Sequence, residues 1–259
     1  MTDDLTPVAL THSRPHLEKE EGSGARTLTH RIVTSTIKQV TRIICQVDDT
    51  QLARVPAHGP LILITNHVNF LEVPVLYTHL QPRPVTGFVK AENLNHPFLG
   101  PLLFRVWEGI PLERGEADIQ AFRQALQALD EGRILAVAPE GTRSGHGRLQ
   151  QGHPGTAFVA LRSGAPILPI AFYGGEAFWN NMSHLRRTNF HITVGRPFYV
   201  NASGVRVTRE IRHQMADEIM YQLAALLPPA YRGFYSDLRQ ASETYLRFSP
   251  GAVSNLHHA

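Results

Sequence analysis

Two residues that could perform acid–base chemistry lie in the segment from Asn66 to Glu72, which reads Asn-His-Val-Asn-Phe-Leu-Glu. A carboxylate beside an imidazole fixes the tautomer of the ring and stabilises the imidazolium, so His67 and Glu72 could form a general base. On one continuous helix, residues five apart are separated by about 140° around the axis. The spacing therefore predicts that His67 lies in a turn and Glu72 in the first turns of the helix that follows. A surface histidine beside a solvated glutamate is the alternative.

A second segment, from Glu140 to Ser144, carries groups that could bind an anion. The planar guanidinium of Arg143 suits phosphate, and Thr142 offers a hydroxyl. Gly141 allows the backbone to approach a ligand closely, so that N–H groups of the loop could add further donors. A turn with a solvated arginine is the alternative.

Two shorter segments differ in the role that their residues predict. Arg114 ends the segment Gly109-Ile110-Pro111-Leu112-Glu113-Arg114 and offers a further phosphate ligand. The segment from Ala165 to Pro169 is interpreted as structural, a strand that is entered through proline. From the residues alone, only the first of these two is expected to bind substrate.

Short apolar runs beside these segments indicate the elements that must position them. The pattern predicts strands at Leu61–Ile64, Val85–Val89, Ile134–Ala138, Ile167–Phe172 and Phe190–Val194. It predicts helices at Leu71–Leu80, Ile119–Leu129, Thr156–Arg162 and Thr208–Leu227. Strands that alternate with helices indicate an α/β fold, with a mostly parallel central sheet flanked by helices and an N-terminal amphipathic helix. In such folds, sites gather where strands end and helices begin.

The composition divides the chain into four segments. Residues 1–25 are predicted to be a flexible tail, residues 26–47 an amphipathic helix, residues 48–247 the main domain, and residues 248–259 a loose C-terminus. The helical segment holds no acidic residue, and its apolar side chains recur at helical spacing. These are Val33, Ile37, Val40, Ile44 and Val47, with Ile32 and Ile43 widening the stripe. The helix packs on the core or lies at a membrane surface, and both hold if it frames a membrane-facing cleft.

The overall composition limits the classes of partner that the chain is expected to bind. The formal net charge is only +3 and the sequence pI is about 9.2, a mild basic bias that favours an anionic surface without requiring nucleic acid. No apolar run approaches the roughly 18 residues that a membrane span needs, and residues 1–21 lack the layout of a secretory signal. If this protein meets a membrane, it therefore lies on it, and we expect no nucleic-acid partner. The single cysteine, Cys45, excludes an intramolecular disulfide.

The order of these segments resembles the four motif blocks of the lysophosphatidic acid acyltransferase family, the PlsC-like glycerolipid acyltransferases. The blocks are Asn66-His67 with an acid five residues after the histidine, Gly109–Arg114, Glu140–Ser144 and Pro166–Pro169. The resemblance extends over roughly Leu61 to Pro197. One block alone is weak evidence, but four in order, each beside a predicted strand, are a strong signal.

The resemblance implies acyl transfer from an acyl thioester, of coenzyme A or acyl carrier protein, to the free hydroxyl of a lysophospholipid. The first acceptor that it implies is 1-acylglycerol-3-phosphate, which would give phosphatidic acid. His67 would deprotonate that hydroxyl and Glu72 would orient the histidine, with no covalent acyl-enzyme, no metal and no cofactor. We expect such a protein to be peripheral, at the cytoplasmic face of the membrane.

Further roles follow from the same resemblance, residue by residue. Lys90 and the backbone N–H groups near Gly141 would stabilise the tetrahedral oxyanion. The phosphate of the acceptor would be held by Arg114, Thr142 and Arg143. The residues that would support the motif blocks are Asn66, Glu140 and Pro169.

Two positions depart from the family pattern and leave other functions open. Glu72 stands where the family usually has aspartate, and Gln151–Pro154 stands where it often has a Phe-Lys pair before the glycine at Gly155. The alternatives are an acyltransferase for a different lysolipid or glycolipid, and a lipid-binding protein without catalysis. A serine hydrolase is disfavoured because the chain has no Gly-x-Ser-x-Gly segment. A zinc hydrolase is disfavoured because no His-x-x-x-His pair lies on a predicted helix.

Overall fold

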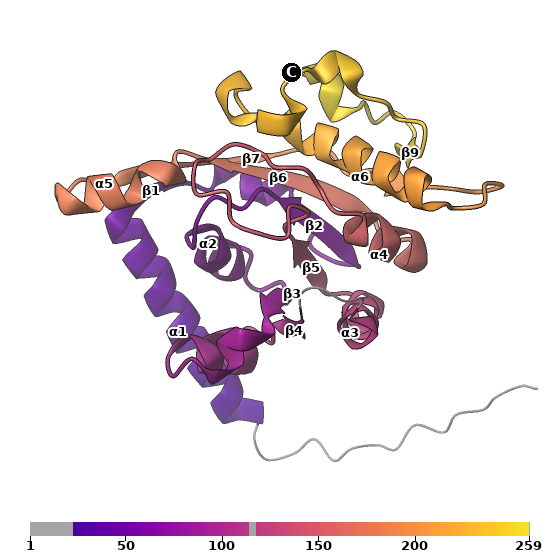
Figure 1. The fold of residues 1–259 in the computed structure, drawn as a ribbon. Helices are drawn as coiled ribbons and strands as arrows, with labels where there is room; N and C mark the ends of the chain where they lie inside the picture. Colours follow the sequence, from indigo (N-terminus) through magenta and orange to yellow (C-terminus); the bar gives the residue numbers. More distant parts are fainter. Residues whose placement is uncertain (1–22, 114–117, 259) are drawn as a thin grey trace, which may run out of the picture.

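The computed structural model describes residues 23–113 and 118–258, which form a central sheet with helices on both faces (Figure 1). The strands are β1 (Cys45–Asp48), β2 (Leu61–Thr65), β3 (Val85–Lys90), β4 (Ile110–Leu112), β5 (Ile134–Val137), β6 (Ile167–Tyr173), β7 (Thr188–Val194), β8 (Tyr199–Val200) and β9 (Leu246–Arg247). The α-helices are α1 (Ser23–Ile44), α2 (Glu72–His79), α3 (Ile119–Asp130), α4 (Gly155–Ser163), α5 (Phe178–Ser183) and α6 (Arg209–Ala224). Each strand and helix predicted for the main domain is present at or within a few residues of its expected bounds.

The predicted fold class is confirmed. The seven-stranded sheet has the order β1-β7-β6-β2-β5-β3-β4, and β8 and β9 form a separate pair. In the large sheet, β6 and β7 are antiparallel and the other neighbours are parallel. The carboxyl ends of β2, β5, β3 and β6 therefore meet at one edge, where α/β folds place their sites.

Side chains of β2 alternate between two cores. Ile62 and Ile64 pack with residues of α3, α4 and α6, whereas Leu61 and Leu63 pack with residues of α2. Figure 1 shows α2 and α6 on opposite faces of the sheet. Because β2 is buried on both faces, it is a rigid base for the loop that follows it.

The helix predicted at residues 26–47 ends earlier than expected, which is a correction. α1 stops at Ile44, and Cys45–Asp48 forms the edge strand β1, which pairs with Thr188–His191 of β7. Cys45 is buried and Gln46 exposed, so this segment follows the two-residue period of a strand. Short apolar segments fit both periods, and here pairing with the sheet decides between them.

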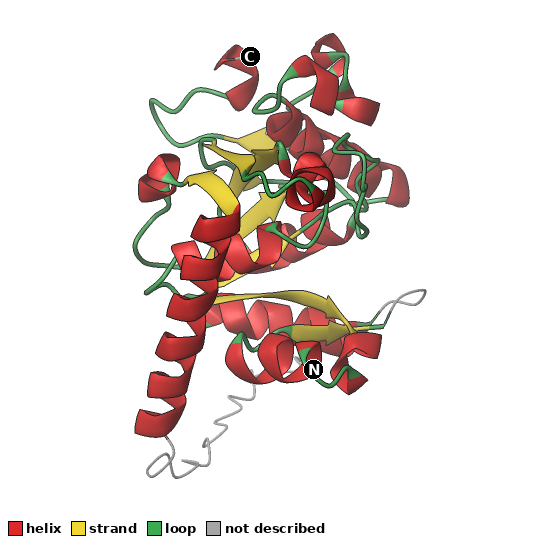
Figure 2. Ribbon diagram, turned by 90° about the vertical axis from the view of Figure 1, so that its left-hand side faces the viewer, coloured by secondary structure: helices red, strands yellow, loops and turns green. Residues whose placement is uncertain are grey.

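The long helix α1 runs along one side of the molecule (Figure 2), and it has apolar side chains that face inward and others that face solvent. Ile37 and Ile44 pack against the core beneath α2, as expected for a packed helix. The apolar side chains that face solvent are Leu28, Ile32, Val40 and Ile43. Val40, which the sequence pattern places in one stripe with Ile37 and Ile44, is therefore on the exposed side. None of the described helices combines the length and the apolarity that crossing a bilayer requires.

The predictions for the two ends of the chain have different outcomes. Of the predicted flexible tail, residues 1–22 lie outside the described residues. The predicted loose C-terminus is wrong for Ser254 and Asn255, which are buried. Asn255 accepts a hydrogen bond from the Arg196 backbone N–H (2.7 Å) and donates its own N–H to Gln222 (3.0 Å). The Ser-Pro-Gly composition indicates a loop but carries no information about these buried polar partners.

Candidate functional site

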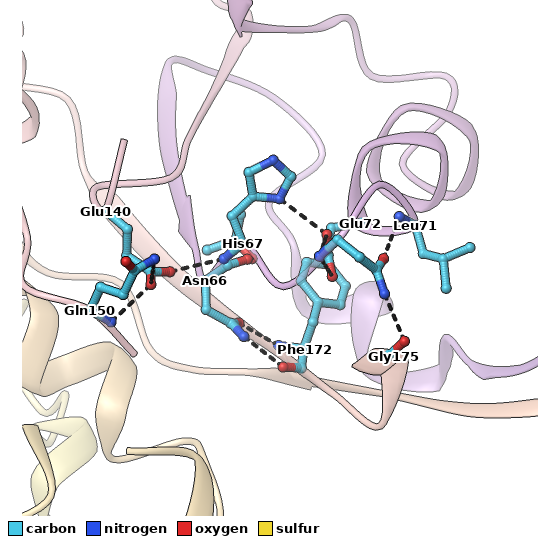
Figure 3. A network of polar contacts seen from close by, with 10 residues as sticks. Asn66, His67, Leu71, Glu72, Glu140, Gln150, Phe172 and Gly175 are labelled. Atoms are coloured by element: carbon cyan, nitrogen blue, oxygen red, sulfur yellow. Dashed lines mark hydrogen bonds and ion pairs between the residues drawn. The ribbon is translucent and has the colours of Figure 1, made fainter. Parts of the chain in front are cut away.

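Asn66 fastens the loop after β2 to the neighbouring strand β6 (Figure 3). Its side-chain Nδ2 donates to the carbonyl oxygen of Phe172 (2.7 Å), and its Oδ1 accepts from the Phe172 N–H (2.8 Å). Asn66 is buried, so these bonds also satisfy its amide away from water. They extend the pairing of β2 and β6 by a side chain, and they fix the backbone from which His67 projects.

His67 and Glu72 make the contact that the sequence predicts. His67 lies in the loop, α2 begins at Glu72, and the His67 Nδ1 to Glu72 Oε2 distance is 3.1 Å. The Glu72 side chain is 1% exposed and that of His67 is 20% exposed. An ionised Glu72 can only accept, so Nδ1 carries the proton and Nε2 is left as the basic nitrogen. Figure 3 shows the second ring nitrogen on the side of the ring away from Glu72.

Asn69 is a site residue that our sequence-based prediction missed. Its N–H donates to both carboxylate oxygens of Glu72 (3.2 and 3.3 Å), and its Oδ1 accepts from the Leu71 N–H (2.8 Å). Its Nδ2 donates to the carbonyl oxygen of Gly175 (2.7 Å). An asparagine shortly before a helix commonly bonds the backbone two residues on, and this local signal was available. The contact with Gly175 had no such signal.

Glu140 fastens the loop after β5 to the loop after β2. One of its carboxylate oxygens accepts from the His67 backbone N–H (2.9 Å), and the other accepts from the Gln150 N–H (2.9 Å). Burial raises the pKa of the Glu140 carboxyl, although these hydrogen bonds act in the opposite direction. Two backbone bonds, from Ser144 N–H to the His67 carbonyl (2.8 Å) and from Gly145 N–H to the Val68 carbonyl (2.9 Å), add to the connection.

The glycine of the second motif is used differently from the prediction. Gly141 has a φ of +67°, a left-handed conformation that favours glycine. Its N–H donates to the Ala138 carbonyl (3.0 Å), so this amide is already occupied and cannot also bind an oxyanion. Within the described residues, the N–H groups of Thr142 and Arg143 have no hydrogen-bond partner. These two amides are the ones that remain for a ligand.

The other residues that the sequence predicts for the site lie outside this hydrogen-bond network. Thr142 and Arg143 are exposed on the loop after β5, and Pro169 is buried in β6 opposite Ile64 of β2. Lys90 ends β3, which β5 separates from β2, and it forms an exposed ion pair with Glu92 (3.5 Å). Arg114 lies outside the described residues.

Cys45 is the one cysteine that could serve as a nucleophile, and its surroundings do not suit that role. It is buried in β1, and burial raises the pKa of its thiol to about 11. A thiol with such a pKa holds almost no thiolate at neutral pH, so Cys45 is a poor nucleophile. Cys45 is thus a small buried hydrophobic residue of the core.

Comparisons with known proteins match the region that contains this network. The Acyltransferase family model matches residues 46–173. A 1-acyl-sn-glycerol-3-phosphate acyltransferase from Limnanthes alba is 33% identical over 121 residues, which is 46% of this chain and 42% of that protein. A lyso-ornithine lipid O-acyltransferase from Pseudomonas aeruginosa is 30% identical over 113 residues, 43% of this chain and 42% of that protein. The chain thus spans about two fifths of the length of these curated relatives.

A solved structure shares the fold. The crystal structure of the 1-acyl-sn-glycerophosphate (LPA) acyltransferase PlsC from Thermotoga maritima superposes with a TM-score of 0.56. The superposition covers 78% of this chain and 81% of that one, at 19% sequence identity. At this identity the similarity concerns the arrangement of the elements.

Proposed function

Because the chain belongs to the acyltransferase family, we propose that it transfers an acyl group from an acyl thioester to the free hydroxyl of a lysophospholipid. The observation that carries the proposal is the buried Glu72 carboxylate on Nδ1 of His67, at the carboxyl end of β2. The family match includes the loops that hold this pair. A protein that only binds lipid has no need of an oriented imidazole, so the pair favours catalysis over the lipid-binding alternative.

In the proposed reaction, Nε2 of His67 takes the proton of the acceptor hydroxyl. The hydroxyl oxygen then attacks the thioester carbonyl carbon, and a tetrahedral oxyanion forms. When the oxyanion collapses and the C–S bond breaks, the imidazolium gives its proton to the departing thiolate sulfur, which leaves as the thiol. Glu72 stabilises the imidazolium between these two steps. No group of the protein becomes acylated, in keeping with the buried Cys45 thiol.

We assign the oxyanion to N–H donors on the loop after β5. The unpaired amides of Thr142 and Arg143 follow the left-handed turn at Gly141, and that loop is bonded directly to the His67 backbone. Preorganised N–H donors of this kind stabilise charge that develops in a transition state. Lys90 is a further proposed donor from the end of β3.

The acceptor is proposed to be 1-acylglycerol-3-phosphate, with Arg143 as a ligand of its phosphate and Arg114 and Thr142 as further ligands. Arg143 supports this assignment because it is exposed beside the catalytic loop and makes no ion pair within the described residues. A second acceptor class, another lysolipid, is favoured by the relative named for lyso-ornithine lipid. Donor thioesters of coenzyme A and of acyl carrier protein are both compatible with this chemistry.

We further propose that the protein works peripherally, at the cytoplasmic face of a membrane. The exposed apolar stripe of α1 supports this, because residues 23–47 also contain no acidic side chain. Apolar side chains with flanking cations suit an anionic lipid surface.

The decisive experiment compares the wild type with His67→Ala in an acyl-transfer assay. The acceptors are 1-acylglycerol-3-phosphate and lyso-ornithine lipid, and the donors are acyl-coenzyme A and acyl carrier protein. We expect the variant to lose about a hundredfold or more in kcat, since general base catalysis contributes that much. His213→Ala on α6 is the matched control and should keep full activity. Unchanged transfer by His67→Ala would reject His67 as the base, and no transfer by the wild type would favour the lipid-binding alternative.

A further inference from the structure

A second exposed apolar surface lies directly beside the catalytic loop. Trp179 and Met182 of α5 and Leu185 in the turn after it are exposed, Trp179 by 64% and Leu185 by 98%. Phe70, which lies between His67 and Glu72 in the sequence, joins them. Its ring centroid is 5.6 Å from that of Trp179. We call the four side chains of Phe70, Trp179, Met182 and Leu185 the α5 surface.

The backbone at Leu185 shows that this side chain is not there for local stability. Leu185 has a φ of +54° and ends α5, with its N–H bonded to the Met182 carbonyl and the Arg186 N–H bonded to the Asn181 carbonyl. This pattern is a Schellman motif, in which the left-handed position is usually glycine. An almost fully exposed leucine in that position is unfavourable both for the backbone and for contact with water. Such a residue points to a role outside folding.

The charged residues in the segment that carries the α5 surface are basic. From Ala177 to Arg209 the chain has no acidic residue, and Arg186 makes no ion pair within the described residues. Glu176, the residue before this segment, accepts a hydrogen bond from the Tyr231 hydroxyl (2.6 Å), and near the end of α1 Asp49 forms an ion pair with Arg42 (3.1 Å). The surface therefore combines exposed apolar groups with the positive charge of Arg186.

α5 is fastened both to α1 and to the catalytic loop. Arg187 donates to the carbonyl oxygens of Arg42 (2.6 Å) and Cys45 (2.8 Å) at the end of α1, and Figure 1 shows α5 beside that end. On the other side, Asn69 donates to the Gly175 carbonyl (2.7 Å), one turn before α5. The α5 surface thus connects the exposed stripe of α1 with the loop that carries His67.

We propose that the α5 surface is a membrane contact that inserts into an anionic bilayer and holds the catalytic loop at the lipid. The proposal rests on the proposed function, because a lysolipid acceptor must reach His67 from that bilayer. Indole rings such as that of Trp179 favour the headgroup level of membranes, and arginines beside them bind anionic lipid. Phe70 makes the contact part of the catalytic loop, so docking and acceptor capture occur at the same place.

Trp179 provides a direct readout. The chain has two tryptophans, and the other, Trp107, is buried, so a Trp107→Phe variant isolates the emission of Trp179. We expect that emission to shift to the blue with vesicles of phosphatidylcholine and phosphatidylglycerol, and less with phosphatidylcholine alone. No shift with the anionic vesicles would overturn the proposal. A shift that depends on protein concentration without lipid would identify a second copy of the chain as the occupant, and would also overturn it.

Leu185→Asn tests the surface itself, since asparagine tolerates a positive φ. The variant should sediment with the anionic vesicles about tenfold more weakly, given what burial of one leucine contributes. Val205→Asn, another exposed aliphatic residue in a turn of the same acid-free segment, should bind like the wild type. Leu185→Gly should bind as weakly as Leu185→Asn while its melting temperature stays equal to or above that of the wild type. Wild-type binding by both Leu185 variants would contradict the proposal.

Acyl transfer separates this inference from the proposed function. With an acceptor presented in vesicles, Leu185→Asn should lose activity in proportion to its binding. With a short-chain acceptor dissolved in water, it should match the wild type, because the catalytic pair is intact. If the wild type transfers to no acceptor, the proposed function fails, and the Trp179 emission still decides whether the α5 surface binds lipid. Equal activity of the variant and the wild type on vesicles would reject the coupling to catalysis.

Discussion

The loop after β2 and the loop after β5 meet at the same edge of the sheet, but they are held very differently. In the first, Asn66 and Glu72 are buried, and their side chains bond neighbouring strands or backbone. In the second, Gly141, Thr142 and Arg143 are exposed, and two of their three N–H groups have no partner within the described residues. Glu140 is the junction between the two loops.

This difference follows from what each loop has to do in the proposed reaction. A general base needs a fixed tautomer and a fixed direction, which buried hydrogen bonds supply. A ligand for a charged substrate must instead be reachable from solvent or from the membrane surface. We therefore expect substitutions in the first loop to lower kcat or stability, and substitutions in the second to raise KM.

The largest effect is expected for Glu72→Gln. Loss of the carboxylate charge removes the stabilisation of the imidazolium and permits the wrong tautomer, so kcat should fall by about 10² to 10⁴. Glu72→Asp, one methylene shorter, should fall between Gln and the wild type. Glu131→Gln, at the exposed end of α3, is the control and should have no effect on steady-state kinetics. If Glu72→Gln kept its kcat but melted at a lower temperature, Glu72 would be structural only.

A smaller effect, on stability, is expected for Glu140→Gln. An amide has one acceptor oxygen for the two backbone N–H groups that Glu140 binds, so the variant should lose about 1–3 kcal/mol of unfolding free energy. The size of the loss depends on pH. Burial raises the pKa of Glu140 above its unfolded value of about 4.3, so its contribution to stability is full below that value and is lost as pH rises through the folded pKa.

Melting curves of the wild type and Glu140→Gln between about pH 4 and about pH 7 check this sign. The difference in unfolding free energy should narrow as the pH rises, because only the wild type titrates at this position. A difference that widens with pH would mean that hydrogen bonding to the ionised carboxylate outweighs its burial.

The smallest effect is expected for Arg143→Ala. Removal of this proposed phosphate ligand should raise KM for 1-acylglycerol-3-phosphate about tenfold and leave kcat nearly unchanged. The effect should weaken at high salt, because exposed charges are screened. Arg206→Ala, in the turn before α6, serves as the control. A fall in kcat with an unchanged KM would instead mean that the Arg143 guanidinium, in addition to its backbone N–H, acts in the transition state, and the contrast between the side chains of the two loops would no longer hold.

Local patterns were enough to predict the placement of His67 before α2 and most of the main elements. These are the strands β2, β3, β5, β6 and β7 and the helices α2, α3, α4 and α6. They were not enough for the partners of the loop, because Phe172 and Gly175 are each 106 residues from the side chains that they bind. Contacts at such distances depend on strand order, which periodicity does not contain. The same reason explains β1, since its pairing with β7 decides against continuing the helix.

The hydrogen bonds that hold the His67 loop have a consequence for folding during synthesis of the chain. A chain leaves the ribosome from its N-terminus, so His67 and Glu72 emerge early, while Glu140 follows 73 residues after His67 and the Phe172 partner of Asn66 later still. Until β6 has emerged and joined the sheet, the loop lacks the bonds that orient its imidazole. The nascent chain therefore carries the His67–Glu72 pair through the synthesis of the 106 residues that separate Asn66 from Phe172 without the contacts that orient the imidazole.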